Sequence, residues 1–240
     1  DALSSSGSWI WGGRNLLPPL GLSDLGNVRS EWTVALPGET YTVLPTADDW
    51  TLTVNGNTTD DIPEEPSAGT IRSRLEDLPG IVEVGVAAND DGSFTVEFVN
   101  PRQIPGTMTG SDATVTQLHA GYDGTAGLTF KLGVTANGAT LVTTSMPAHA
   151  SPSQVEGNAQ SGAGLQGLAN INDVTVSGRG LLLDPWVIVA FNPPSIDAVT
   201  VEDWSADDVV VETVAGALSP EPVTVSQYVD ARAEAREVNH

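Results

Sequence analysis

The residues of this chain that could carry acid–base or nucleophilic chemistry are three histidines and many carboxylates. His119, His149 and His240 lie far apart in the sequence, and none has the spacing of an HExxH zinc site. The chain contains no cysteine, which excludes disulfides, thiolate nucleophiles and cysteine-ligated zinc. No phosphate-binding loop or nucleophile-elbow motif joins a strand to a helix. We therefore predict no catalytic residue, no cofactor and no enzymatic activity; a hydrolase with paired carboxylates stays an alternative.

Clusters of acidic residues are the remaining candidates for a metal site, because hard carboxylate oxygens suit calcium. None of them follows the spacing of an EF-hand loop, and a hairpin turn is enough to explain Asp90-Asp91-Gly92. We predict no metal site. Calcium binding is left open at Asp48-Asp49, Asp60-Asp61, Asn89-Asp90-Asp91 and Asp207-Asp208.

The charge balance limits which partners the chain can have. Its net charge is -22, from 31 acidic and 9 basic residues, and Lys131 is the only lysine. Such an acidic chain is not expected to bind nucleic acid or an anionic membrane surface. No apolar run approaches the roughly 20 residues that span a bilayer, and no signal peptide is visible. Partners are expected to be basic, or to bind through apolar and main-chain contacts.

The most informative feature is an internal repeat, in which an apolar strand, a linker, a short helix and two strands follow one another twice. We predict an α+β, β-rich fold of two tandem similar modules, each a sheet covered by a short helix. An extended N-terminal arm and a C-terminal helix flank them. The matching segments are 50–56, 67–81, 84–86 and 94–98 in the first module, and 128–132, 151–155, 165–171, 174–176 and 186–191 in the second.

Within the first module the pattern predicts individual elements. Ser67 can cap a helix whose apolar face carries Ile71, Leu75 and Leu78. Alternating valines at positions 82, 84 and 86 predict a strand, and the turn at 89–92 predicts a hairpin with the alternating strand 94–98. In the second module Ser153-Gln-Val-Glu156 fits a capping box, and the segment Gly162-Ala-Gly164 interrupts the helix.

The predicted division of the chain has four parts: an N-terminal arm and hairpin at 1–47, module one at 48–125, module two at 126–219, and a C-terminal helix at 220–240. In the first part, Trp32–Leu36 and Tyr41–Val43 are expected to pair as a hairpin across Pro37-Gly38.

The two ends of the chain carry the candidate partner-binding residues. Segments 9–11 and 16–20 are apolar but show neither helical nor strand periodicity. The arm could pack on its own domain or dock into a neighbouring subunit, and both interpretations stay open. The terminal helix has a narrow apolar stripe typical of a docked helix. The candidates are Trp9, Trp11, Leu16, Leu17, Tyr228 and Val238.

The two modules, about 150 of the 240 residues, resemble a repeat that occurs in virion structural proteins of tailed bacteriophages of actinobacteria, and in large bacterial surface proteins. The residues that carry the resemblance are Leu52–Thr59, Ile62-Pro63, Ala68, Ile71, Leu75–Leu78, Ile81, Val84, Val86 and Phe94–Phe98. The second module departs from the pattern in its split helix and in its first strand, Leu128–Leu132.

The resemblance implies a non-enzymatic structural protein of the virion, with no catalytic residue to carry over. We expect a tail or minor tail component whose partners are other virion proteins and further copies of itself in a homo-oligomer. A capsid decoration protein or head fibre is the alternative within this class. A secreted adhesin or carbohydrate-binding module is the alternative from another class.

Overall fold

The computed structural model describes residues 2–3, 9–11, 14–15, 29–136, 138–169, 171, 173–191, 196–206 and 209–215. The protein is α+β and β-rich, as the sequence predicts. The helices are α1 (Ala68–Glu76), α2 (Pro152–Glu156) and the 3-10 turn η2 (Leu165–Gly167). The strands are β1 (Ala2–Leu3), β2 (Trp9–Trp11), β3 (Arg14–Asn15), β4 (Arg29–Ala35), β5 (Glu39–Pro45), β6 (Thr51–Val54), β7 (Asn57–Thr58), β8 (Glu83–Ala88), β9 (Phe94–Asn100), β10 (Met108–Ser111), β11 (Ala113–Ala120), β12 (Thr129–Ala136), β13 (Ala139–Val142), β14 (Met146–Pro147), β15 (Val174–Ser177), β16 (Trp186–Phe191), β17 (Ile196–Glu202) and β18 (Val210–Ala215).

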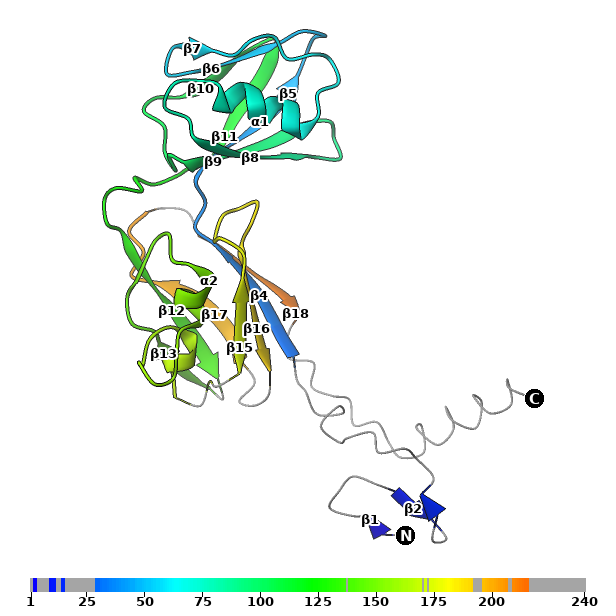
Figure 1. Ribbon diagram of the computed structural model, residues 1–240, viewed down its shortest axis with the longest axis vertical. Helices are drawn as coiled ribbons and strands as arrows, with labels where there is room; N and C mark the ends of the chain where they lie inside the picture. Colours follow the sequence, from blue (N-terminus) through cyan, green and yellow to red (C-terminus); the bar gives the residue numbers. More distant parts are fainter. Residues whose placement is uncertain are drawn as a thin grey trace, which may run out of the picture.

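Two hydrophobic cores divide most of these elements into two units (Figure 1). Unit one, residues 39–120, contains the antiparallel sheet β11-β5-β9-β8, the smaller sheet β10-β6-β7 and α1. Unit two, residues 29–36 and 122–215, contains the antiparallel sheet β18-β4-β16-β15 together with β12, which pairs with β13, β14 and β17. Each core lies between the sheets of its unit and includes apolar residues of its helix.

The two units share the order of their strands. Counted from the edge formed by its last strand, the four-stranded sheet of unit two has the order β18-β4-β16-β15, and that of unit one has the order β11-β5-β9-β8. The strands therefore correspond one to one in these orders. In the smaller sheets, β12 takes the place of β6 as the strand that pairs on both sides. Helices α1 and α2 are each preceded by a capping serine, Ser67 or Ser151, whose side chain accepts a hydrogen bond from the main chain three residues later.

The same side-chain contact also occurs in both units. The buried Thr59 accepts a hydrogen bond from Leu52 N at 3.1 Å, and the buried Thr143 accepts one from Leu132 N at 2.9 Å. Each threonine returns a main-chain hydrogen bond to the same leucine, at 2.8 and 2.9 Å. These contacts satisfy main-chain groups that would otherwise be buried without a partner.

The predicted hairpin across Pro37-Gly38 is wrong. Strand β4 pairs with β16 and β18 of unit two, whereas β5 pairs with β9 and β11 of unit one. Pro37-Gly38 is therefore the connection between the units, and unit one is inserted after the first strand of unit two. The alternating apolar residues of β4 belong to a sheet whose other strands lie more than 100 residues later in the sequence. The predicted boundaries at 48, 126 and 220 stay predictions.

Several local predictions are confirmed. Ser67 caps α1, and Ile71 and Leu75 are buried on its inner face. Strands β8 and β9 form the predicted hairpin, in which Asn89 N donates to Ser93 O at 2.8 Å. Two predictions are wrong in register. Val82 is 68% exposed, because the pairing of β8 with β9 shifts between Glu83 and Val84.

The second wrong register concerns α2. Its capping box is formed by Ser151 and Gln154 rather than by Ser153 and Glu156. Pro152 then occupies the first helical turn, where its missing N–H costs no hydrogen bond.

The N-terminal arm differs from its sequence pattern, because residues Trp9–Trp11 form a strand between β1 and β3. The predicted helix at 220–240 lies outside the described residues. In unit two, β18 runs antiparallel to β4 and Ala215 pairs with Glu31. The arm therefore enters, and the described chain leaves, at one end of unit two, remote from unit one (Figure 1). Within the part of the chain that the structure describes, no helix is both long and apolar enough to cross a membrane.

Candidate functional site: the junction between the units

A buried carboxylate joins the units. Glu97 lies on β9, on the face opposite to Val96 and Phe98, and its exposed fraction is 0%. Its Oε1 accepts hydrogen bonds from Gly38 N at 3.0 Å and from Leu182 N at 2.9 Å. Its Oε2 accepts one from Leu183 N at 2.8 Å. A carboxylate of unit one is thus held by the connection between the units and by a loop of unit two.

The loop that reaches Glu97 is the β15–β16 hairpin loop of unit two, residues 178–185, here called the junction loop. The main-chain oxygen of Asp184 accepts hydrogen bonds from Arg179 N and Leu181 N, both at 3.0 Å, which closes the loop on itself. Gly180 has φ +71°, and a Cβ there would lie 2.5 Å from the ring of Trp186. Only glycine fits this conformation and this space. Gly180 O also accepts a hydrogen bond from Leu36 N at 2.9 Å, which ties the loop to the first crossing of the chain.

Glycine is also required at the crossing itself. A Cβ on Gly38 would lie 2.0 Å from the main-chain oxygen of Phe98, next to Glu97. The chain can therefore pass against β9 only where no side chain intervenes.

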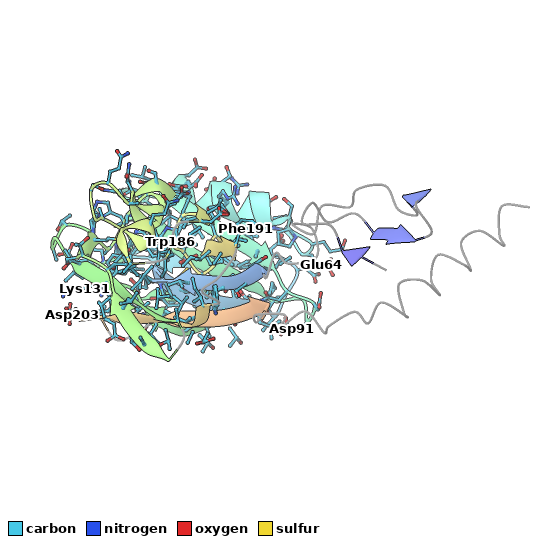
Figure 2. The ribbon with its side chains drawn as sticks, turned by 90° about the horizontal axis from the view of Figure 1, so that it is seen from below. Glu64, Asp91, Lys131, Trp186, Phe191 and Asp203 are labelled. Carbon is cyan, nitrogen blue, oxygen red and sulfur yellow. The ribbon has the colours of Figure 1, made fainter. Side chains whose placement is uncertain are left out.

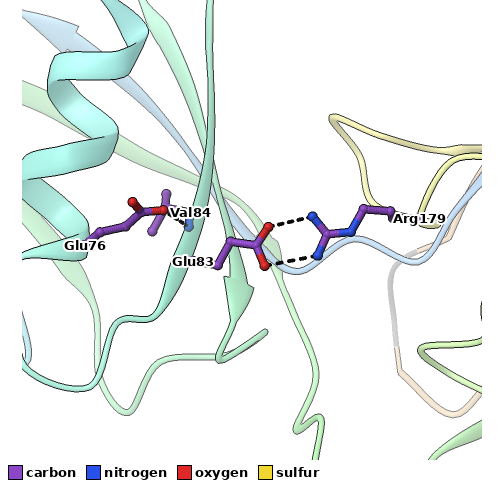
Figure 3. A network of polar contacts seen from close by, with 4 residues as sticks. All are labelled: Glu76, Glu83, Val84 and Arg179. Carbon is purple, nitrogen blue, oxygen red and sulfur yellow. Dashed lines mark hydrogen bonds and ion pairs between the residues drawn. The ribbon is translucent and has the colours of Figure 1, made fainter.

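An ion pair stands beside this contact (Figure 3). Arg179 Nη1 and Nη2 donate to Glu83 Oε1 and Oε2 at 2.6 and 3.0 Å, in a bidentate arrangement. The hydrogen bond from Arg179 lowers the pKa of Glu83 below its ordinary value of 4.5, and the positive charges of Arg102 and Arg72 act in the same direction. Since both side chains are about half exposed, solvent screens the pair, and its geometry orients the units more than it stabilises them.

The second crossing of the chain, after β11, is held by an aromatic contact. The guanidinium of Arg102 lies over the ring of Tyr122, 5.3 Å from its centroid. Tyr122 packs edge-on against Trp204 at 5.1 Å and donates to Ala148 O at 3.2 Å. Burial raises the pKa of Tyr122 to about 12. A residue of the β9–β10 connection is thereby attached to the core of unit two.

A second buried carboxylate, Glu39, lies at the start of β5. It accepts hydrogen bonds from Tyr41 Oη at 2.5 Å, Ile104 N at 2.6 Å and Gln117 Nε2 at 3.1 Å. Burial raises its pKa above the ordinary 4.5, and the hydrogen bonds lower it. Its N–H donates to Arg102 O at 2.6 Å, so it holds the β9–β10 connection against β5.

Two cavities open at the junction, of about 570 and 460 Å³. Glu83, Val99 and Arg179 line both of them. The larger one also contacts Arg102, Asp123 and His149, and the smaller one contacts Arg72 and Glu76 of α1. The carboxylates Glu97 and Glu83 are occupied as hydrogen-bond acceptors across the junction. This arrangement fixes relative position rather than pairing a proton donor with a proton acceptor.

The acidic clusters that the structure describes do not converge on a common metal site. Among the described residues, no three His, Asp or Glu side chains gather in a group that could hold a metal ion. Asp91 accepts hydrogen bonds from Ser93 N and Oγ, and these lower its pKa, as expected of a turn residue. Asp60 pairs with Arg74. Asp207 and Asp208 lie outside the described residues.

None of the partner-binding residues expected from the sequence is placed at the junction. Trp9 and Trp11 lie on β2, where the structure describes the main chain alone, and Leu16, Leu17, Tyr228 and Val238 lie outside the described residues. Sequence reasoning missed Glu97, Glu83 and Arg179. For these residues the sequence offers one signal, which is that Glu97 is an acidic residue between apolar neighbours in a strand. Such a residue ordinarily marks a solvated face.

No protein-family model and no curated protein matches the chain. A solved chain from Mycobacterium phage Patience is similar to it, with 22% sequence identity and a TM-score of 0.30. The match covers 67% of this chain and 57% of that chain, so this chain spans little more than half of its length.

Proposed function

We propose that this chain is a non-enzymatic structural protein of a phage virion, a tail or minor tail component that acts by assembling with neighbouring subunits. The observation that carries the proposal is where the arm joins unit two and where the described chain ends. The arm enters and the described chain leaves at the same end of unit two, while unit one lies at the other end (Figure 1). Two segments from one end of an elongated body suit attachment to a neighbour.

The junction supports this proposal. Two chain crossings, the Glu97 contacts and the Glu83–Arg179 pair join the units at several separate points. A joint with several contacts resists bending, as a load-transmitting rod requires. The shared strand order and the Thr59 and Thr143 contacts support a duplicated module as the origin of the two units.

The acidic surface agrees with a particle component that must stay separate from other particles. The described cations are few, and Lys131 pairs with Asp203 at 2.5 Å at the periphery of unit two (Figure 2). Like charge on neighbouring particles opposes aggregation.

The proposal is tested by immunogold electron microscopy of purified particles of the phage that encodes this chain, with an antibody against unit one. Gold along the tail or at its tip is the expected result. Gold over the capsid would support the decoration protein or head fibre instead. If no gold binds and mass spectrometry finds no peptide of the chain in the particle, the virion proposal fails and a secreted adhesin becomes the leading alternative.

A further inference from the structure

The smaller junction cavity follows an unpaired strand edge. β8 is the last strand of the sheet β11-β5-β9-β8 and, among the strands that the structure describes, pairs with β9 alone. The cavity of about 460 Å³ is lined by five consecutive residues of this strand, 83–87. Arg72 and Glu76 of α1 stand on one side, and Leu183 and Asp184 of the junction loop on the other. A groove with a strand edge as its floor is the geometry that receives an added strand.

One contact shows which main-chain N–H and C=O groups of β8 point away from β9. Val84 N donates to Glu76 Oε1 at 3.1 Å, away from β9 (Figure 3). In an antiparallel strand, alternate residues direct their N–H and C=O groups to the same side. The N–H and C=O of Val86 therefore point to the open side, where the cavity lies.

The equivalent edge in unit two is covered. On β15, Val176 N donates to Glu156 Oε2 at 3.4 Å, and Val174 O accepts from Gln166 Nε2 at 3.1 Å. Gln166 comes from the segment 157–173, which contains η2 and has only the short loop 77–82 as its counterpart in unit one. Because Val84 is the counterpart of Val176, the place that Gln166 covers corresponds to Val82 in unit one. Beyond the glutamate contact, β8 continues to Ala88, whereas β15 ends at Ser177. The open edge of β8 is therefore longer than that of β15.

We infer that the open edge of β8 receives residues 14–17 of the N-terminal arm of a second copy by strand addition. This inference rests on the proposed assembly function and names the contact that performs it. Among the described strands, β3 pairs with β2 alone and lies at the edge of its sheet. Leu16 and Leu17 follow β3 in the sequence, and Pro18-Pro19 limits the added strand because proline has no N–H to donate.

Charge favours this occupant over other segments of the chain. Arg14 is the only charged residue between Asp1 and Asp24 in a chain of net charge -22. The groove offers Glu76 and the exposed Asp184 beside β8, while Glu83 is already paired with Arg179. Apart from Glu97 and the Glu83–Arg179 pair, the groove contains these two carboxylates and Arg72, so an arm whose single charge is Arg14 is repelled less than the acidic segments of the chain.

The position of the arm favours a second copy over the same chain. The start of β4, to which the arm is joined, lies at the end of unit two remote from β8 (Figure 1). The arm is therefore attached at the end of unit two that lies away from the groove of its own chain. A contact between the arm of one copy and the β8 edge of the next is head-to-tail, which builds rings or filaments rather than closed pairs.

Engineered cysteines test the contact directly in the full chain, which has no cysteine of its own. One copy carries Ala88→Cys at the exposed end of β8, and a second copy carries Gly13→Cys or Leu16→Cys in the arm. After mixing and mild oxidation, we expect a disulfide-linked heterodimer, because a disulfide needs Cα atoms within about 7 Å. The matched control places the edge cysteine at Ser177 of β15, where we expect this heterodimer to be lost.

A heterodimer that forms equally with the Ser177→Cys control would overturn the inference, as would its absence with Ala88→Cys. A chain carrying both cysteines that forms only an intrachain disulfide would overturn the second copy as occupant. These results leave the gold-labelling test of the virion proposal untouched, so the two can fail separately.

A charge reversal provides a second readout. Arg14→Glu is expected to raise the dissociation constant for self-association about three- to fivefold, as for loss of one exposed ion pair. Arg74→Glu, the same change on α1 away from the groove, is the control and is expected to leave that constant unchanged. Sedimentation equilibrium of the full chain measures both constants, and equal effects of the two changes would contradict the assigned site.

Discussion

Glu97 and Leu183 are 86 residues apart in the sequence, yet the carboxylate of one accepts the main-chain hydrogen bond of the other at 2.8 Å. Together with Leu182 and Gly38, Leu183 supplies the buried Glu97 with three main-chain donors. A carboxylate with three such donors stays buried because the donors replace its hydration. One side chain of β9 therefore contributes three of the hydrogen bonds that fix the relative position of the two units.

Glu97→Gln should destabilise the protein by about 2–4 kcal/mol, because the amide group turns a hydrogen-bond donor toward main-chain N–H groups. Glu64→Gln makes the same chemical change on an exposed loop at the periphery (Figure 2) and should have almost no effect. Denaturant unfolding measures both changes. Hydrogen exchange at Leu182 and Leu183 should accelerate in the first variant only, and unchanged exchange there would contradict the assigned role of Glu97.

The Glu83–Arg179 pair should make stability depend on acid pH. The pKa of Glu83 in the folded protein is lowered from 4.5, so the stabilisation is present above about pH 4.5 and is lost as the pH falls through the lowered pKa. Arg179→Met should cost about 0.5–1 kcal/mol at neutral pH, because the pair is half exposed. It should also flatten the fall in unfolding free energy between pH 5 and 3. A pH profile of the variant parallel to that of the parent would disprove this account.

Gly38→Ala should strain the connection between the units, since the new methyl group would overlap the main-chain oxygen of Phe98. We expect a loss of about 1–3 kcal/mol, typical of overpacking, and a change in the relative orientation of the units measurable by small-angle scattering. Gly124→Ala is the matched control in the second connection, where a Cβ meets nothing within 4 Å. Equal melting temperatures for the two variants would show that the close approach of Gly38 to β9 is unimportant.

Thr59→Val and Thr143→Val should have similar effects, because each threonine makes the same contact in its own unit. Each change leaves a buried leucine N–H without its acceptor and should cost about 1–3 kcal/mol. The double variant should show the sum, since the sites lie in separate cores. Thr53→Val, which removes an exposed contact with Thr58, is the control and should change the unfolding free energy by less than about 0.5 kcal/mol. Strongly unequal effects would argue that the two threonines are not equivalent.

Local features of the fold could be predicted because the residues that determine them lie within the same short segment. The Ser67 side chain caps α1 from within three residues, and the turn at Asn89–Gly92 closes a hairpin between adjacent strands. The alternation of Phe94, Val96 and Phe98 marks the inner face of β9 wherever that strand pairs. Where prediction failed locally, a small displacement was the reason. The bulge before Val84 turned Val82 outward, and the cap of α2 moved two residues to Ser151.

The candidate site could not be predicted, since it forms between segments that the chain order separates. Period-two alternation places Glu97 on the outer face of β9, and that face would be solvated if unit one stood alone. The junction loop covers it instead. Likewise Arg179 carries no local sign of its partner, because Glu83 lies 96 residues earlier.

By itself the sequence determined the β-rich class, the order of helix and hairpin in unit one, and the strongly acidic charge, because composition and short-range periodicity depend on neighbouring residues alone. Only the tertiary structure decided which sheet β4 joins, that unit one is inserted behind it, and that Glu97 is buried rather than solvated. Strand pairing and the covering of a sheet face depend on residues far along the chain. The sequence of a strand such as Trp32–Leu36 suits the sheet of either unit, and only its pairing with distant strands decides which sheet it joins.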